Sequence, residues 1–341
     1  MYIVDFLKDD REWEEYILSK SSATNYHQLK WRTIVSQTFG HKPIYLIAKE
    51  NGVVKGVLPL FCMKSMIFGS FITSMPFFNY GGLCVDTIDA AKVLLEKAIS
   101  VAKDEKVKHI ELRHSEDINI GLQVKKNKVT MILELQSDPN VFWERFKPKV
   151  RNHIRNAEKN GLVLQIGGHA QLDNFYAVFA RNMRDLGTPV YSKVFFSNIL
   201  KEYPEETKIF SVLLKNKVVA SGFTIQFRDT LEIPWASSIR EYNKLSTNIY
   251  LYWEIIKYAC EKGLKYFDFG RCSLDSGTFN FKKQWGTQPK QLYWHYWLKK
   301  GDTPPELNPA NPKYELFIKI WTRMPVFLAN MIGPKIIKFI P

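Results

Sequence analysis

The feature that most constrains the fold of this chain is an internal repeat. The segment KENGVVKGVLPLF (residues 49–61) parallels LKNKVVASGFTIQF (residues 214–227), and AKDEKVKHIELRHS (residues 102–115) parallels ACEKGLKYFDFGRCS (residues 259–273). In each half the residue pattern predicts a hairpin, a further strand, a helix and a closing strand, in that order. One duplicated unit with a changed loop length explains both similarities better than a coincidence of common hairpin patterns.

The repeat predicts two units of the α/β (α+β) class, each with a mixed twisted sheet flanked by helices. Asn51-Gly52 and Asn216-Lys217 are the expected hairpin turns, because Asn and Gly tolerate the positive φ angles of tight turns. The expected boundaries are 1–137 for the first unit, 138–300 for the second and 301–341 for a C-terminal extension.

The charge of the chain is strongly positive. It has 48 Lys and Arg against 34 Asp and Glu, a net charge of +14, while 45% hydrophobic residues is ordinary for a globular protein. This composition excludes wholesale disorder. The positive field attracts nucleic acid, anionic lipid or phosphorylated sugar carriers, and a basic surface that only keeps the protein in solution is the alternative.

The cysteine pattern and the hydropathy exclude several protein classes. Cys62, Cys84, Cys260 and Cys272 form no C-x-x-C pair, which predicts a reducing compartment and no zinc site. The acidic N-terminal segment is not a signal peptide, and no run of 18 apolar residues could span a membrane. We therefore expect a cytoplasmic protein without a metal centre or a tightly bound cofactor.

A basic helix is predicted at about residues 145–160, at the start of the second unit. Pro148 suits the first turn of a helix and Gly161 suits its end. Arg151 and Arg155 are four residues apart and so lie on one face of this helix. Since guanidinium groups bind phosphate oxygens in pairs, both are candidate substrate-binding residues; a solvated basic face is the open alternative.

The stretch YFDFGRCSLDSGTFNFKKQWG (residues 266–286) places a carboxylate inside an aromatic strand and several cations just after it. A buried carboxylate without a partner strongly destabilises a fold, so Asp268 needs a partner such as Arg271, Lys282 or Lys283. Ligands of open α/β sheets bind outside the carboxyl ends of strands. The stretch is therefore the candidate active site, and a buried pair that only holds the strand end is the alternative.

Four segments carry a family resemblance: KVRNHIRNAEKNGL, NFYAVFARNMRDLGTPVYSKVFF, PWASSIREYNKLSTNIYLYW and YFDFGRCSLDSGTFNFKKQWG. In this order they resemble the FemAB-like acyltransferases of the GNAT superfamily, and most nearly the branch associated with exosortase/PEP-CTERM exopolysaccharide loci. The resemblance spans about residues 40–298. It implies two tandem GNAT-like domains and transfer of an aminoacyl group from aminoacyl-tRNA to an amine on a peptidoglycan precursor.

The acyl donor stays open between aminoacyl-tRNA and acyl-CoA. GNAT enzymes that use acyl-CoA normally carry an (R/Q)-x-x-G-x-(G/A) loop whose backbone amides hold the pyrophosphate. The equivalent stretch here, REYNKLSTN (residues 240–248), contains no glycine, which argues against acyl-CoA. The long coiled-coil arm that some FemAB-like members carry for tRNA is not evident either.

The resemblance also implies catalytic roles. FNFKKQWG is similar to the FK-x-x-FG segment of Fem-type enzymes, with Trp285 in place of Phe, and this match places Lys282 in the site. We expect Asp268 to take up the proton of an attacking amine, or to orient the group that does, while a lysine stabilises the oxyanion. Asp268, Lys282 and Arg271 are the predicted catalytic residues.

Further candidates for substrate binding come from loops and helix ends. The double glycine of PFFNYGG (residues 76–82) would let the backbone approach a ligand closely, and a tight turn is the alternative. The predicted substrate-binding residues are Asn79, Tyr80, Gly81, Arg151, Arg155, Arg184, Lys193, Trp235, Ser237, Tyr242, Ser273, Ser276, Lys283 and Trp285.

The C-terminal segment LFIKIWTRMPVFLANMIGPKIIKFIP (residues 316–341) is apolar and carries only cationic charges. Pro325 and Pro334 divide it into pieces too short to span a membrane. It is suited to the headgroup region of an anionic membrane, and a helix packed against the second unit is the alternative.

Together these features predict an N-acyltransferase that transfers an aminoacyl or acyl group to an amine on a cell-envelope polysaccharide or peptidoglycan-type precursor. The reaction would be direct attack on an activated ester or thioester. Two alternatives remain: a CoA-dependent GNAT acetyltransferase and a non-catalytic module that binds a glycan or RNA. Expected partners are an anionic acyl donor (tRNA or CoA), a sugar- or lipid-linked acceptor and the inner face of an anionic membrane.

Overall fold

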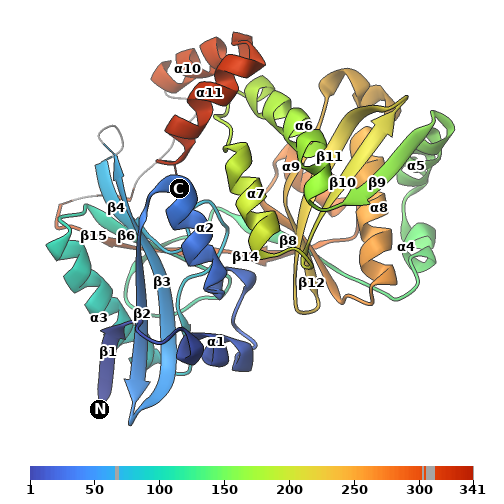
Figure 1. The fold of residues 1–341 in the computed structure, drawn as a ribbon. Coiled ribbons are helices and arrows are strands. Elements are labelled where there is room, and N and C mark those ends of the chain that lie inside the picture. The colour runs from blue at the N-terminus through green and yellow to red at the C-terminus, as the bar shows by residue number, and fades with distance from the viewer. Residues whose placement is uncertain (66–68, 302, 305–311, 341) are drawn as a thin grey trace. The chain divides into compact units, whose positions relative to one another are not determined.

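The computed structural model describes residues 1–65, 69–301, 303–304 and 312–340. These residues form two compact units, each a mixed sheet flanked by helices, as the sequence predicts (Figure 1). The first unit comprises Met1–Val129, Gln291–Leu307 and Lys338–Pro341, and the second comprises Thr130–Lys290 and Asn308–Ile337. The expected boundaries at residues 137 and 300 differ from this division, because the chain enters each unit more than once.

Within the described residues, the sheet of the first unit has eight strands. Their order is β1-β2-β3-β4-β6-β15-β7, with β5 paired to β3. The elements are β1 (Tyr2–Phe6), α1 (Asp10–Ser19), the 3₁₀ helix η1 (Asn25–His27), α2 (Lys30–Phe39), β2 (Lys42–Glu50), β3 (Val53–Ser65), β4 (Gly69–Thr73), β5 (Cys84–Val85), α3 (Ile88–Asp104), β6 (His109–His114), β7 (Gln123–Lys125) and β15 (Tyr293–Leu298).

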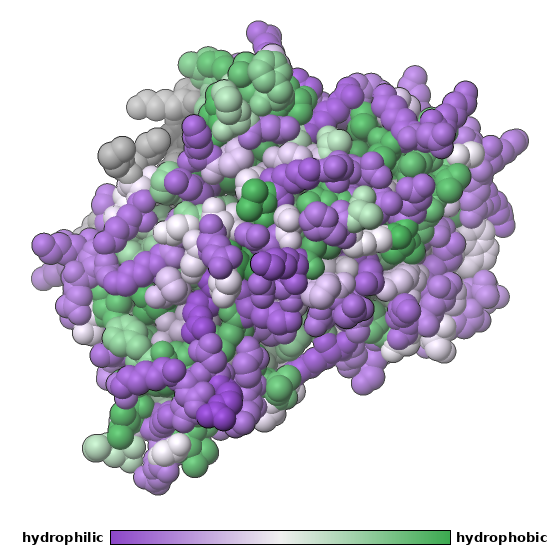
Figure 2. Space-filling view, viewed as in Figure 1, coloured by the Kyte–Doolittle hydropathy of each residue, from purple (hydrophilic) through white to green (hydrophobic). Residues whose placement is uncertain are grey.

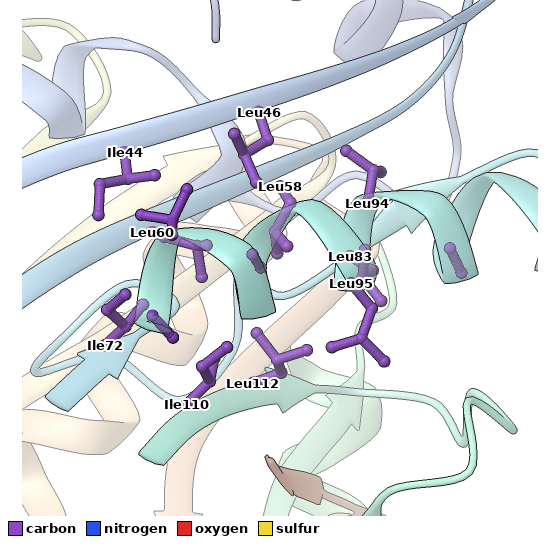
Figure 3. Packing of buried hydrophobic residues seen from close by; sticks show 14 of the residues in the cluster. Ile44, Leu46, Leu58, Leu60, Ile72, Leu83, Leu94, Leu95, Ile110 and Leu112 are labelled. Atoms are coloured by element: carbon purple, nitrogen blue, oxygen red, sulfur yellow. The ribbon is translucent and has the colours of Figure 1, made fainter. Parts of the chain in front are cut away.

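Alternation along β2 divides the core of the first unit between the two faces of its sheet. Ile44 and Leu46 join a cluster with Leu58 and Leu60 of β3 and the apolar face of α3 (Figure 3). Tyr45, between them, points to the other face, where its ring lies 4.9 Å from that of Trp13 in α1. Helices therefore bury both faces of the central strands.

In the described part of the second unit the sheet has seven strands, in the order β14-β8-β13-β12-β11-β10-β9. The elements are β8 (Val129–Glu134), α4 (Asn140–Arg145), α5 (Pro148–Lys159), β9 (Leu162–Gly167), η2 (His169–Gln171), α6 (Leu172–Asp185), α7 (Lys193–Glu202), β10 (Thr207–Leu214), β11 (Lys217–Phe227), β12 (Thr230–Ser238), η3 (Arg240–Leu245), α8 (Thr247–Glu261), β13 (Tyr266–Cys272), α9 (Gly277–Lys283), β14 (Gln288–Gln291), α10 (Pro312–Arg323) and α11 (Val326–Ile337).

Aromatic residues fix helices to both faces of the second sheet. On one face, Phe223 of β11 packs against Phe175 of α6 and Phe196 of α7, with ring centroids 5.3 and 5.4 Å apart. On the other face, the ring of Phe269 in β13 stacks on Tyr252 of α8 at 5.2 Å. The predicted basic helix is α5, which packs through Val150 and Ile154.

The predicted repeat is visible in the strand pairing of the two units. Each sheet contains one corresponding parallel pair, β4 with β6 and β12 with β13, joined through the helices α3 and α8. Both hairpins carry a bulge at the same place, between Ala48 and Lys49 and between Val212 and Leu213. The second turn lies at residues 215–216, one residue earlier than predicted, because Leu214 pairs with Lys217.

One strand of each sheet comes from a distant part of the chain. β15 lies beside β6 in the first sheet, and β8 occupies the corresponding place beside β13 in the second. β15 pairs with β6 along its whole length, from Tyr293 opposite His114 to Leu298 opposite His109. Backbone hydrogen-bonding groups are the same in nearly every residue, so the sequence does not show which strands pair. A division of the sequence into contiguous domains therefore does not predict that β15 joins the first sheet.

Candidate active site

The parallel strands β12 and β13 pair only at their beginnings. Thr230–Glu232 pair with Tyr266–Asp268, and the register ends there, although β12 runs to Ser238 and β13 to Cys272. A bulge on β12 at Ile233 and Pro234 directly follows the last pair, Glu232 with Asp268. Where two neighbouring strands diverge, their peptide groups can bond a ligand instead of each other, and this place is the carboxyl end of both strands.

Asp268 is buried at the point where the strands diverge. Its Oδ1 accepts hydrogen bonds from the hydroxyl of Thr130, at 2.6 Å, and from the backbone N–H of Gly270, at 2.8 Å. Phe267 and Phe269 face Tyr252 of α8, so alternation along the strand places Asp268 on the opposite face of the sheet. The carboxylate therefore ties β8 to the end of β13.

Lys282 is buried on α9, and its ammonium group is directed at the end of the same strand. The Nζ atom donates to the carbonyl oxygens of Gly270, at 2.8 Å, and Arg271, at 3.0 Å. Burial lowers the pKa of Lys282 to about 8, and interactions with the Cys272 side chain and the Asp268 carboxylate limit this decrease. A lysine with such a pKa is mostly charged at neutral pH and can release its proton just above it.

The helix that carries Lys282 begins at a serine. The hydroxyl of Ser276 accepts the backbone N–H of Phe279 at 3.1 Å, which caps α9, and donates to the carbonyl oxygen of Ser273 at 2.7 Å. Ser276 and Ser273, both predicted to bind substrate, thus shape the turn between β13 and α9. Arg271, the third predicted catalytic residue, has an exposed side chain.

A cavity of about 630 Å³ lies in the second unit beside this helix. Its lining combines basic and aromatic side chains, among them Lys283 and Trp285 of the predicted substrate-binding set. The lining residues are Leu133, Glu134, Gln136, Phe142, Arg145, Phe146, Lys147, Asn280, Lys283, Gln284, Trp285, Gly286 and Gln288. Its size is typical of ligand sites, and its character suits an anion that carries an aromatic or apolar group.

Neither Asp268 nor Lys282 lines this cavity. Trp285, which does, packs on the face of β13 that carries Phe269 and that Tyr252 of α8 covers. Arg145 and Lys147 are lining residues outside the predicted site set. Arg145 and Lys147 belong to the basic segment of the sequence, but they precede the helix α5. Helical spacing, which predicts Arg151 and Arg155, therefore does not mark them.

Arg151 and Arg155 lie on α5, outside the cavity lining. Arg155 is exposed and its guanidinium carbon lies 5.2 Å from the ring centre of Trp143. The N-terminal end of α8 is close by, because Nδ1 of His153 and the hydroxyl of Ser246 are 2.8 Å apart. The glycine-free stretch before α8 forms the 3₁₀ helix η3.

The remaining predicted residues of the second unit have structural contacts of their own. Trp235 is buried among Phe195, Phe196 and Phe223, so it is part of the core. The hydroxyl of Ser237 accepts a hydrogen bond from the amide of Asn182 at 3.1 Å.

Charged and aromatic candidates away from the cavity are also engaged. Arg184 donates to the carbonyl oxygen of Met324 at 3.0 Å, and Lys193 forms an ion pair with Asp173. Tyr242 lies in η3 with Lys217 over its ring. The structure therefore places Ser273, Ser276 and Lys282 in the turn and helix that follow the strand of Asp268, and Lys283 and Trp285 in the lining of the cavity. Arg184, Lys193 and Tyr242 lie elsewhere.

In the first unit, Tyr80 and Gly81 line a smaller cavity of about 160 Å³. Gly81 and Gly82 do allow a close approach there, as predicted for a ligand, but the groups that approach them are side chains of the protein itself. A Cβ atom on Gly81 would lie 2.5 Å from Met75, and one on Gly82 would lie 2.5 Å from the ring of His114. Asn79 is half-buried beside them and does not line the cavity.

His114, which also lines this cavity, belongs to a network with His295 and Asp117 that no sequence pattern predicts. The N–H of Leu83 donates to Nε2 of His114 at 3.0 Å, so Nδ1 of His114 carries the proton and donates to Nδ1 of His295 at 3.0 Å. Nε2 of His295 then lies 3.5 Å from Asp117. His295 comes from β15, and only the strand exchange brings it here.

Comparison with known proteins identifies the class. Residues 144–283 match the family model described as "Acetyltransferase (GNAT) domain". FemX has a similar fold, with a TM-score of 0.69, 15% identity and coverage of 93% of this chain and 100% of FemX. No curated protein matches the chain at a significant level by sequence.

Two further solved structures share the fold. A tandem GNAT protein from the clavulanic acid biosynthesis pathway superposes with a TM-score of 0.58 at 9% identity, over 89% of this chain and 100% of that protein. L-PGS from Bacillus licheniformis superposes with a TM-score of 0.56 at 11% identity, over 93% and 98%.

The second unit thus contains a GNAT acetyltransferase domain, and the chain has a tandem GNAT fold. Residues 144–283 are a GNAT acetyltransferase domain and the fold of the chain is similar to that of FemX, which confirms the predicted fold, the predicted resemblance and the predicted acyltransferase class. Among the described residues, no helix is long and apolar enough to cross a membrane.

Proposed function

We propose that this protein is an N-acyltransferase that transfers an aminoacyl or acyl group to an amine on a cell-envelope polysaccharide or peptidoglycan-type precursor. In this reaction the amine nitrogen bonds to the acyl carbon, and the bond from that carbon to the donor oxygen or sulfur breaks. The proton released by the amine passes to the leaving group or to water. Neither a metal ion nor a covalent enzyme intermediate enters this scheme.

The observation that carries the proposal is the position of the Lys282 ammonium group. It is buried at the carboxyl end of β13, beside the separation of β12 and β13, where it contacts the carbonyl oxygens of Gly270 and Arg271. A fixed cation at this place stabilises the negative oxygen that develops when an amine attacks an acyl carbon. The burial of Lys282 strengthens the interaction because it excludes water.

Asp268 acts in this proposal by orienting the site. Its Oδ1 holds the N–H of Gly270, whose carbonyl oxygen accepts from Lys282. Its negative charge also raises the pKa of Lys282 against the effect of burial. Asp268 therefore contributes to keeping the lysine charged at neutral pH, in addition to fixing the end of the strand. The exposed Arg271 remains a proposed contact for the substrate.

The donor is an anionic carrier, aminoacyl-tRNA or acyl-CoA, and the cavity of the second unit is its proposed binding region. Arg145, Lys147 and Lys283 supply three positive charges to the lining against the single acid Glu134. Phe146 and Trp285, whose ring centroids are 5.3 Å apart, are buried and make part of the lining apolar. The glycine-free η3 in front of α8 favours aminoacyl-tRNA over acyl-CoA.

The acceptor and location are the finer part of the proposal. The resemblance to the exosortase/PEP-CTERM branch supports an amino sugar or peptide of an exopolysaccharide precursor, made on the cytoplasmic side of the membrane. The excess of 14 positive charges agrees with substrates that carry phosphate or diphosphate.

Transfer assays with purified protein test the proposal. Aminoacyl-tRNA and acetyl-CoA are supplied separately with amino-sugar and peptide acceptors, and mass spectrometry detects the acylated amine. The expected result is turnover with an aminoacyl-tRNA and no heat of binding for acetyl-CoA at millimolar concentration. Clear binding and turnover of acetyl-CoA would instead establish the CoA-dependent alternative.

A non-catalytic module remains testable in the same preparation. The enzyme proposal requires that Lys282→Met lower the rate of transfer about 10²–10³-fold while glycan binding persists. Should the protein show no turnover with any donor, yet bind glycan or RNA equally well before and after this substitution, the module explanation would replace the enzyme.

A further inference from the structure

The C-terminal helices α10 and α11 have one face that packs on the second unit. Trp321, Ala329 and Gly333 are buried, and Gly333 approaches Val190 so closely that an added Cβ would lie 2.8 Å from its backbone nitrogen. The carbonyl oxygen of Met324, between the helices, accepts from Arg184 at 3.0 Å. Packing against the second unit, the alternative to membrane binding that the sequence left open, therefore holds for this inner face.

The outer face of the same helices is apolar and uncovered. It consists of Leu316, Phe317, Ile320, Phe327 and Met331, whose exposed fractions range from 36% to 70%. Figure 2 shows hydrophobic side chains gathered at the top of the view, where Figure 1 labels α10 and α11. Single exposed apolar residues are ordinary, but a contiguous group of this kind marks an interaction surface.

Cations border this outer face. Arg323 ends α10, Lys335 lies near the end of α11 and Lys319 lies between the apolar residues of α10. Glu315 is the one acid in the described part of the two helices, and it forms an ion pair with Lys319 at 2.7 Å. The surface thus combines exposed apolar side chains with net positive charge.

We infer that the outer face of α10 and α11 binds the surface of an anionic lipid bilayer. Each helix has 12 residues and so is about 18 Å long, shorter than the roughly 30 Å hydrocarbon core. The helices lie parallel to the membrane plane, with Phe327 and Ile320 among the acyl chains and Arg323 and Lys335 at the lipid phosphates.

Charge favours a membrane over a second copy of the chain. Each copy carries a net charge of +14, so two copies repel each other, whereas anionic lipids attract both. The cores of protein–protein interfaces are also depleted of lysine, and Lys319 lies inside this face. The inference is independent of the proposed acyl transfer, because lipid binding needs neither donor nor acceptor.

Vesicle co-sedimentation of the full chain tests the inference, with phosphatidylcholine vesicles compared with mixed phosphatidylcholine and phosphatidylglycerol vesicles. We expect binding to the anionic vesicles alone, weakened at high salt. The double variant Arg323→Ser with Lys335→Ser removes two cations and is expected to weaken binding about thirtyfold, since each basic residue near such a surface contributes roughly fivefold. The matched control, Lys244→Ser with Lys262→Ser, removes two exposed lysines elsewhere in the second unit and leaves binding within about twofold.

The apolar contribution is tested with Phe327→Ser and Met331→Ser, against Val53→Ser, which removes an exposed apolar residue of the first unit. The first pair is expected to abolish sedimentation and the control to preserve it, with circular dichroism showing that all variants fold. Equal binding of all variants, or no binding to either vesicle, overturns the inference. A self-association in analytical ultracentrifugation that Phe327→Ser abolishes overturns it in favour of a second copy.

Discussion

Nδ1 of His114 lies 3.0 Å from Nδ1 of His295, although 181 positions separate the two residues in the sequence. Because the N–H of Leu83 occupies Nε2 of His114, the proton between the two rings belongs to His114. The pair joins β6 to β15 inside the first unit, in addition to their backbone pairing. This contact exists only because β15 returns to the first sheet after the last strand of the second sheet.

Replacement of His295 is expected to destabilise the first unit. In His295→Ala the buried N–H of His114 loses its acceptor, and an unsatisfied buried donor costs about 1–3 kcal/mol. Urea denaturation followed by tryptophan fluorescence measures the change. His169→Ala, which alters an exposed histidine of the second unit, serves as the control and should change stability by less than about 0.5 kcal/mol. Equal effects of the two substitutions would contradict the role of the pair.

Acid is expected to unfold the first unit before the carboxylates are fully titrated. Burial lowers the pKa of His27 to about 4, and burial lowers that of His114 well below 6.5. Both groups are neutral in the folded state, so the stability that depends on them is complete above pH 6.5 and declines as the unfolded state binds protons below it.

His27 alone accounts for about 3 kcal/mol of this loss between pH 6.5 and 4. Protonation of His114 or His295 would also place two N–H groups opposite each other and break their hydrogen bond. Unfolding midpoints in urea, measured at several pH values, should fall steadily over this range. A midpoint that is constant from pH 7 to 4.5 would show that these histidines remain accessible to protons.

Gly82 is expected to tolerate no side chain. A Cβ at this position would lie 2.5 Å from the ring of His114 and 2.8 Å from the carbonyl oxygen of Arg113. Gly82→Ala should therefore lower the free energy of unfolding by about 1–3 kcal/mol. Gly277, the first residue of α9, has no atom within 4 Å of a built Cβ, so Gly277→Ala should be neutral or slightly stabilising in a thermal melt.

Lys282 is expected to dominate catalysis in its charged form. Lys282→Met should lower kcat about 10²–10³-fold, the effect of losing one donor to a developing oxyanion. Because the pKa of Lys282 is about 8, the wild-type rate should decline as the pH rises through that value and the cation is lost. Lys282→Arg, which keeps its charge in alkali, should retain part of the activity and lose this decline.

The control for Lys282 is Lys262→Met, which removes an exposed lysine just after α8. Its rate and its pH profile should match those of the wild type. If the wild-type rate rose as the pH passed 8, and if Lys282→Met kept full activity, Lys282 would have only a structural role through its contacts with Gly270 and Arg271.

Asp268→Asn is expected to separate the charge of this residue from its hydrogen bonds. The amide oxygen can still accept from Thr130 and Gly270, so the thermal melting temperature should change little. The pKa of Lys282 should decrease, since the negative charge of Asp268 raises it in the native protein. The alkaline decline of the rate then moves to lower pH, whereas an unchanged profile with lowered stability would indicate that Asp268 only supports the fold.

The candidate site was only partly predictable from the sequence. The spacing in residues 266–286 indicated that Asp268, Lys282 and Ser276 meet at a strand end, because they lie within one strand–turn–helix segment. Thr130, which bonds Asp268, lies 138 positions away, and no local pattern marks it. The packing of Trp235 in the core and the ion pair of Lys193 depend on neighbours from other elements, which no local pattern shows.

The sequence by itself determined the repeated order of strands and helices, since turn residues and apolar periodicity act over a few neighbouring positions. Asn51-Gly52, the buried strand at Phe267 and the capped helices all follow from such local chemistry. Only the tertiary structure decided which sheet β8 and β15 join, and so which residues meet His114 and Asp268. Strand pairing uses backbone groups common to every residue, and its partner is selected by the packing of the whole unit.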